Sequence, residues 1–404
     1  MRKFKFIVCS VAAVLVLTGC QKGDSKDSQP GPDPIPVVPA GELPEGGTAV
    51  DIKTAEGKQT VYNEVLSVID AYTAPATEFT AIGIKSETKN VNVDAVAKVQ
   101  SFETEDPITL LDAEAHIKDF GLTLEAKVAG DDESWGAEAA LGINGEISAK
   151  GTVVVDPETD KKLKLDETLN FNDVGAQAWL TDGNVYVNAD GQGLRDLLEQ
   201  AKPIVAKILP YVMEGIPAGT VLDLNAILDS MCGEDRHFYI PVEGTEKFNP
   251  IALINSIQIE EEDLPSAEDW AKVAETLEQI PFLSFQTYSD GKFGIALDVN
   301  MEAFLDFAEL MELDLDEQIF DMIPEANLKV AVLIRANGLL DSISIGASAK
   351  VDVNVEDDVT VTVKGSASLE EVLTLSYNDE VTMNIPSAEV LADYQQFDPE
   401  ALGM

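Results

Sequence analysis

The chain has 404 residues and a formal net charge of −46 at pH 7, with 73 acidic and 27 basic side chains. Such a surface repels the phosphates of nucleic acids and the head groups of anionic lipids, so we expect no nucleic-acid partner. The length suffices for a substantial core, in one large domain or in two packed halves.

The first 19 residues have the layout of a secretory signal. Arg2, Lys3 and Lys5 form a basic start. An apolar run of about a dozen residues follows, which is shorter than the ~20 that a bilayer crossing needs. The stretch LTGC, which ends at Cys20, resembles the lipobox of bacterial lipoproteins. This resemblance implies cleavage of residues 1–19 and lipid on the Cys20 sulfur; an ordinary secreted protein is the alternative.

Residues 20–48 read as a lipidated cysteine followed by a spacer. The stretch QKGDSKDS after Cys20 loosely resembles the Lys/Asp-rich export signals of surface lipoproteins in the Bacteroidota. Six prolines between positions 30 and 44 favour an extended tether that cannot build a core. We therefore expect an outer-membrane lipoprotein that contacts the membrane through its N-terminal lipid, with the cell surface favoured over the periplasmic side.

A long β-rich section follows. Residues 91–99, 111–119, 122–128, 137–143 and 145–155 alternate apolar with polar side chains, which predicts strands with one buried and one wet face. Gly, Asn and Asp between them predict turns, and so an antiparallel meander. Several inward positions carry small side chains that leave room above the sheet, unless helices simply pack closer there. Four of these positions are Ala95, Ala97, Ala113 and Ala115.

Helices are predicted in the middle of the chain. Residues 193–212 carry a wide apolar stripe, which Pro203 interrupts, so a kink or two abutting helices are expected. Residues 221–231 predict a second helix, and a third begins at Ser266, close to a capping box. The stripe residues that we expect to face an apolar ligand are Leu194, Leu197, Leu198 and Val205.

Two segments repeat one plan. Residues 179–200 and 285–310 both read as strand, Asp-Gly turn, strand and amphipathic helix. The repeat suggests two related halves packed together, residues 49–235 and 236–396, with a single enlarged sheet as the alternative.

This hairpin and helix unit resembles the LolA/LppX-like lipoprotein carriers, over an architecture that runs from about Phe79 to Ile385. The resemblance implies an α+β fold, in which a large curved, half-barrel-like antiparallel sheet is covered by amphipathic helices over an apolar cavity for acyl chains. The ligand is then expected between the alanine face and the striped helix. Two alternatives stay open, a structural or adhesive surface lipoprotein without a small ligand and an unrecognised hydrolase. The protein partner and the oligomeric state are left open.

One loop has the spacing of a calcium site. Five oxygen-bearing residues match EF-hand positions, and a turn that caps the next helix is the favoured alternative. They are Asn188, Asp190, Gln192, Asp196 and Glu199. No cofactor is predicted. His116 lies on an expected wet face, and neither His116 nor His237 belongs to a zinc or catalytic motif, so we expect no enzyme.

Overall fold

The computed structural model describes residues 40–73, 78–101, 108–131, 134–156, 161–212, 220–242, 249–257, 266–310, 323–355 and 359–398. The predicted signal peptide, Cys20 and most of the predicted tether lie outside these residues. Within the described parts, no helix has the length and apolarity that crossing a membrane requires.

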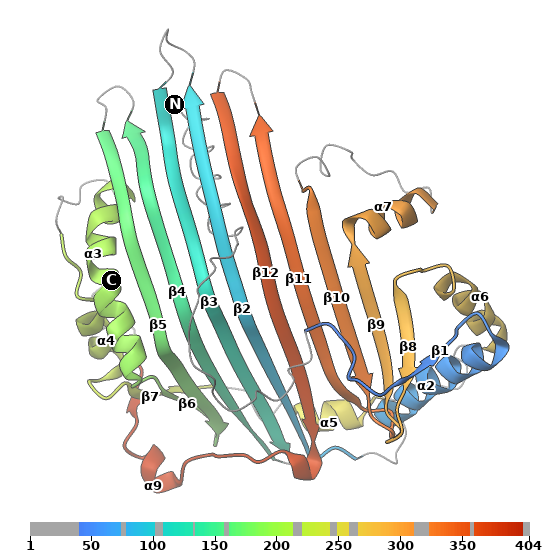
Figure 1. The fold of residues 1–404 in the computed structure, drawn as a ribbon. Helices are drawn as coiled ribbons and strands as arrows, with labels where there is room; N and C mark the ends of the chain where they lie inside the picture. Colours follow the sequence, from blue (N-terminus) through green and yellow to red (C-terminus); the bar gives the residue numbers. More distant parts are fainter. Residues whose placement is uncertain are drawn as a thin grey trace, which may run out of the picture.

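One open sheet of 13 strands spans the molecule (Figure 1). The strand order is β1-β8-β9-β10-β11-β12-β2-β3-β4-β5-β6-β7-β13, antiparallel throughout except where β13 joins β7 in parallel. The strands are β1 (Thr48–Val50), β2 (Ala81–Ser101), β3 (Ile108–Gly130), β4 (Trp135–Asp156), β5 (Lys161–Thr181), β6 (Asn184–Asn188), β7 (His237–Pro241), β8 (Leu283–Thr287), β9 (Phe293–Asn300), β10 (Glu325–Ile334), β11 (Leu340–Val355), β12 (Val359–Tyr377) and β13 (Gln395–Gln396).

Two meanders meet in the centre of this sheet. Strands β2 to β7 follow one another, as do β8 to β12, and β12 then pairs with β2. The predicted segments 49–235 and 236–396 therefore contribute to one continuous sheet. A large, mostly antiparallel sheet with helices on it confirms the predicted layout, whereas the kinship of two halves stays a prediction.

The central strands are longer than predicted. Segments 111–119 and 122–128 both belong to β3, and segments 137–143 and 145–155 both belong to β4. The predicted turns between these segments are wrong, because the chain runs straight on through an irregularity of the ladder instead of reversing. Polar residues that tolerate a positive φ serve a bulge as well as a turn.

Left-handed residues sit at these bulges. Asn90 in β2, Asp119 in β3 and Asp173 in β5 have φ angles of 52°, 48° and 51°. The register of each of these strands shifts against a neighbour at the same point. An inserted residue shifts the alternation of side chains by one position. Apolar residues an odd number of positions apart, one before and one after the bulge, therefore lie on the same face of the sheet.

The same side-chain contact supports two of the bulges. The backbone N–H of Asp119 donates to Oδ1 of Asn92 at 3.0 Å, and that of Asp173 donates to Oδ1 of Asn144 at 2.9 Å. Each asparagine stands on the neighbouring strand. The amide group that leaves the ladder at a bulge thus keeps a hydrogen-bond acceptor.

Most helices lie at the two ends of the sheet (Figure 1). Helices α2 and α6 lie near the end that contains β8 to β10, α3 and α4 lie beside β5, and α5 contacts β3 and α2. Helix α2 has no counterpart among the predicted elements, whereas α3 runs through Pro203 as one helix. The bounds are α2 (Ala55–Thr73), α3 (Gln192–Val212), α4 (Leu224–Cys232), α5 (Pro250–Asn255), α6 (Ala267–Leu277), α7 (Met301–Leu310) and α9 (Ala388–Leu391).

One core cluster ties α2 and α6 to the sheet. Val61 of α2 and Trp270 of α6 pack with Phe285 and Phe293 of β8 and β9. The indole Nε1 of Trp270 donates to the carbonyl of Lys58 at 3.1 Å. Since a buried indole combines apolar area with a satisfied donor, Trp270 fastens one helix to the other.

Replacing Trp270 with Ala should lower the free energy of unfolding by about 3 kcal/mol, because the change empties the centre of this cluster. Denaturant unfolding measures the loss. Val273→Ala on the same helix is the control, since 47% of Val273 is exposed. Equal effects of the two changes would show that α6 does not depend on this contact.

Candidate functional site

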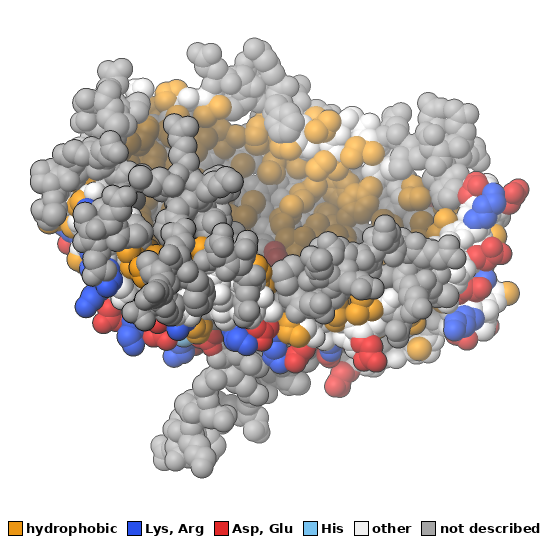
Figure 2. Space-filling view, turned by 90° about the horizontal axis from the view of Figure 1, so that it is seen from above, with side chains coloured by type: hydrophobic (Ala, Val, Ile, Leu, Met, Phe, Trp, Pro, Cys, Tyr) orange, Lys and Arg blue, Asp and Glu red, His pale blue; other side chains and the backbone are white. Residues whose placement is uncertain are grey.

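The long strands separate apolar and polar side chains onto two faces. The register aligns Val363, Ala97 and Ala113 on one face of β12, β2 and β3, and aligns Lys364 with Val96 and Glu114 on the other. Figure 2 shows a hollow lined by hydrophobic side chains, with charged side chains along its outer rim. We call the apolar side the concave face and the other side the convex face.

The four predicted alanines lie together on the concave face. Ala95 pairs with Ala115, and Ala97 pairs with Ala113. Gly365 continues the row on one side, opposite Ala95. Ala95 and Ala97 are fully buried, so they form part of the packed core at this level of the sheet rather than its accessible surface.

Helix α3, predicted to cover these alanines, has its main strand contact with β5. The Gln200 side chain bonds to the backbone of Asn170 twice, accepting from its N–H at 2.8 Å and donating to its carbonyl at 3.1 Å. Lys207 of the same helix forms an ion pair with Glu167 of β5. The half-buried residues Leu194, Leu197, Leu198 and Val205 therefore stand beside β5, with β4 between that strand and β3.

The accessible apolar surface lies on three other residues. Ile84 of β2, Leu124 of β3 and Leu141 of β4 are 42%, 46% and 39% exposed. Leu124 pairs with both Ser86 and Leu141, and Ile84 lies two residues from Ser86 on the same face. The alternation in residues 122–128 predicts an inward Leu124, whereas the predicted ligand site depends on the small side chains of the four alanines.

Packed elements bound this surface on its sides. At one end, α2 and α6 cover β8 to β10. Below it, Asn255 of α5 clasps the start of β2, accepting from the N–H of Phe79 and donating to its carbonyl, both at 2.9 Å. Among the described residues, the helices thus lie to the sides of Leu124 and Leu141, and these two side chains remain exposed.

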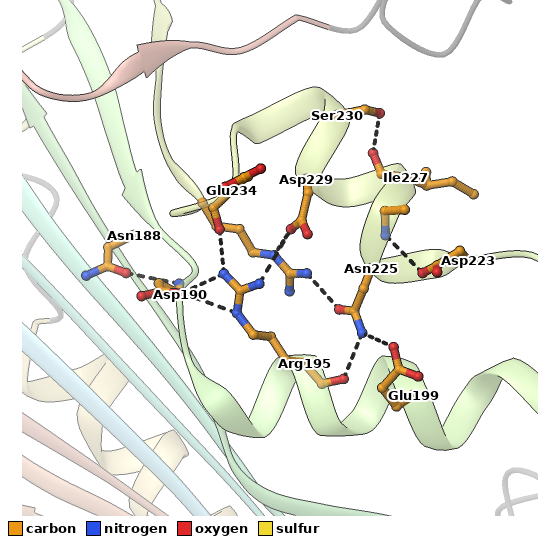
Figure 3. Close-up of polar contacts among 12 residues, drawn as sticks. Asn188, Asp190, Arg195, Glu199, Asp223, Asn225, Ile227, Asp229, Ser230 and Glu234 are labelled. Carbon is orange, nitrogen blue, oxygen red and sulfur yellow. Dashed lines mark hydrogen bonds and ion pairs between the residues drawn. The ribbon is translucent and has the colours of Figure 1, made fainter.

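The predicted calcium loop is occupied by its own contacts (Figure 3). Asp190 accepts from Nη2 of Arg195 at 2.7 Å, and this hydrogen bond raises the pKa of Arg195. Gln192 donates to Asp196 at 2.7 Å, and Glu199 accepts from Asn225 at 2.6 Å. Asn188 accepts from the backbone N–H of Asp190 at 3.1 Å.

A second arginine completes the network. Arg236 is fully buried and donates to Asp229 and to Asn225, each at 2.6 Å. Together the two arginines tie α3, α4 and the start of β7 into one unit (Figure 3). Across the parts of the chain that the structure describes, no three His, Cys, Asp or Glu side chains are grouped to hold a metal ion.

The histidines and the described cysteine have structural surroundings. His116 lies beside Asp94 on the convex face, and the His237 ring stacks on Tyr394 at 5.0 Å between centroids. Cys232 is buried, and this burial raises the pKa of its thiol. A raised thiol pKa disfavours the nucleophilic thiolate, which agrees with a packing role.

Calcium should leave the melting temperature of the protein unchanged, because the loop carboxylates already contact arginine and amide groups. Calorimetric scans with calcium and with EDTA measure this. A bound ion at 100 times its Kd would add ~2.7 kcal/mol of stability. A clear rise of Tm in calcium that is lost in Asp190→Asn would restore the loop as a calcium site.

Comparison with known proteins leaves the family open. No family model and no curated protein matches the chain. A structure on lipid-protein interactions in lipovitellin aligns at 8% identity and a TM-score of 0.19, over 79% of this chain and 27% of that one. A beta-barrel-like protein of unknown function from Brucella abortus aligns at 7% identity and a TM-score of 0.11, over 74% of this chain and 100% of that one. Likenesses at these TM-scores establish neither a shared fold nor a shared activity.

Proposed function

We propose that the protein is a lipid-anchored binder of an apolar, lipid-like ligand, which it holds on the concave face. The observation that carries this proposal is the exposure of Ile84, Leu124 and Leu141 on three adjacent strands. Large aliphatic side chains that stay accessible side by side on a hollowed surface mark a site of interaction.

The chemistry of this surface suits a flexible hydrocarbon. Its exposed groups are aliphatic, and each methylene that moves there from water gains ~0.8 kcal/mol. On the convex face, by contrast, the exposed Val96 stands between Asp94 and Lys98 and forms no continuous apolar surface. A ligand with several methylenes can therefore bind to the concave face without a charged contact.

We propose binding rather than catalysis. His116 and His237 both take part in contacts on the side away from Leu124, as their strand registers show. A structural or adhesive role stays the alternative, and it requires a protein instead of a small ligand to cover the concave face.

Leu124→Asp should weaken binding of an apolar fluorescent probe by about tenfold, or ~1.4 kcal/mol, because it places a charge in the contact surface. Probe titration measures this change. Val96→Asp is the matched control, since Val96 is 51% exposed on the opposite face of the neighbouring strand. Unchanged binding in Leu124→Asp, or an equal loss in both variants, would place the probe elsewhere.

The proposed anchor is Cys20, and the membrane location depends on it. Cys20→Ala should abolish incorporation of a fatty-acid probe and release the protein from the membrane fraction, because it removes the sulfur to which the lipid is attached. Cys232→Ala controls for labelling of a buried thiol. Undiminished labelling of Cys20→Ala would refute the anchor. For the wild-type protein, protease digestion of intact cells distinguishes display on the cell surface from display on the periplasmic side.

A further inference from the structure

A carboxylate lies within the apolar concave face. Glu371 of β12 pairs with Thr88 of β2 and Ile345 of β11, in the same alternating series as Leu373. The hydroxyl of Ser86 donates to its Oε1 at 3.0 Å, and Ser86 shares a row with the exposed Leu124. Glu371 therefore borders the surface that we propose as the ligand site.

This carboxylate lacks the cation that other acidic groups have. Glu167, also on the concave side by register, forms an ion pair with Lys207. The next residue in the strand, Glu370, faces the convex side and accepts from Asn90 at 2.8 Å. Among the described residues, Ser86 is the one hydrogen-bond partner of Glu371, and no lysine or arginine is within ion-pair distance of it.

Such a group has acceptor capacity to spare. An ionised carboxylate offers about four lone-pair positions, and Ser86 uses one of them. Glu371 is half-buried among aliphatic neighbours, where water satisfies the remaining positions less well than in bulk solvent. A ligand group that donates a hydrogen bond would be favoured there, whereas an anionic group would be repelled.

We propose that Glu371, positioned by Ser86, holds the polar end of a single-chain amphiphile whose head donates hydrogen bonds and carries no negative charge. This inference depends on the proposed function and specifies its ligand class as long-chain amines and alcohols. The hydrocarbon chain crosses the strands from Ser86 over Leu124 to Leu141, a span of about 10 Å for two strand spacings.

Three ligands with the same twelve-carbon chain separate the head from the tail: dodecylamine, dodecanol and laurate. Each displaces the apolar fluorescent probe from the full-length protein. Amine and alcohol should bind at least about tenfold more tightly than laurate, which corresponds to ~1.4 kcal/mol. In Glu371→Leu this preference should vanish, because laurate gains affinity while the other two lose it.

Two further variants test whether any loss of binding is specific to the charge of Glu371. Glu371→Gln retains the size and an acceptor, so the amine should lose affinity while the alcohol keeps most of it, even if the leucine variant folds poorly. Glu370→Leu changes the adjacent acid on the convex face and should leave all three affinities as in the wild type. Equal binding of the three ligands, or a preference that survives in Glu371→Leu, overturns the assignment of Glu371 and leaves the apolar site intact. Failure of the wild type to bind the probe and every ligand overturns the proposed function itself.

Discussion

The fold depends on keeping the concave face of the long central strands mostly apolar along their whole length. A strand of about 20 residues twists and drifts, and a single slip of register would send every leucine to the wrong side. In β3, Ile117 before the bulge and Leu122 after it are five residues apart, so they would face opposite sides without the inserted Asp119. The bulges thus keep the apolar side chains before and after them on the same face.

The sequence predicts which residues form strands, and which way their side chains face, better than it predicts where each strand begins and ends. Alternation in residues 111–128 and 137–155 identifies strand and the direction of each side chain, because period two is a local property. It cannot tell a bulge from a turn, since Asn and Asp at positive φ suit both and the choice depends on the neighbouring strand. The pairing of β12 with β2 is equally invisible, because it joins residues more than 250 positions apart.

The site shows the same division. The alanines at 95, 97, 113 and 115 share a face as alternation requires, yet their exposure depends on what packs nearby, which no local pattern reports. The accessible residues Leu124 and Leu141 look like ordinary core in the sequence. The sequence does not identify Glu371 as a site residue either. It is one of 73 acidic residues, and only the register of β12 with β2 places it beside Ser86.

The strand lengths have a consequence for contacts between copies of the protein. From β12 outward they fall from 19 to 16, 10, 8, 5 and finally 3 residues. The opposite border ends in the two residues of β13. A long edge strand has unpaired backbone N–H and C=O groups, to which a strand of another chain can add. Short edge strands offer fewer such groups. The part of β5 that extends beyond its short neighbour β6 bonds instead to Gln200, whose side chain accepts from and donates to the backbone of Asn170 as a strand partner would. Helix α3, which the sequence predicts as a cover for the alanines, therefore occupies a border of β5 at which another chain could otherwise add a strand.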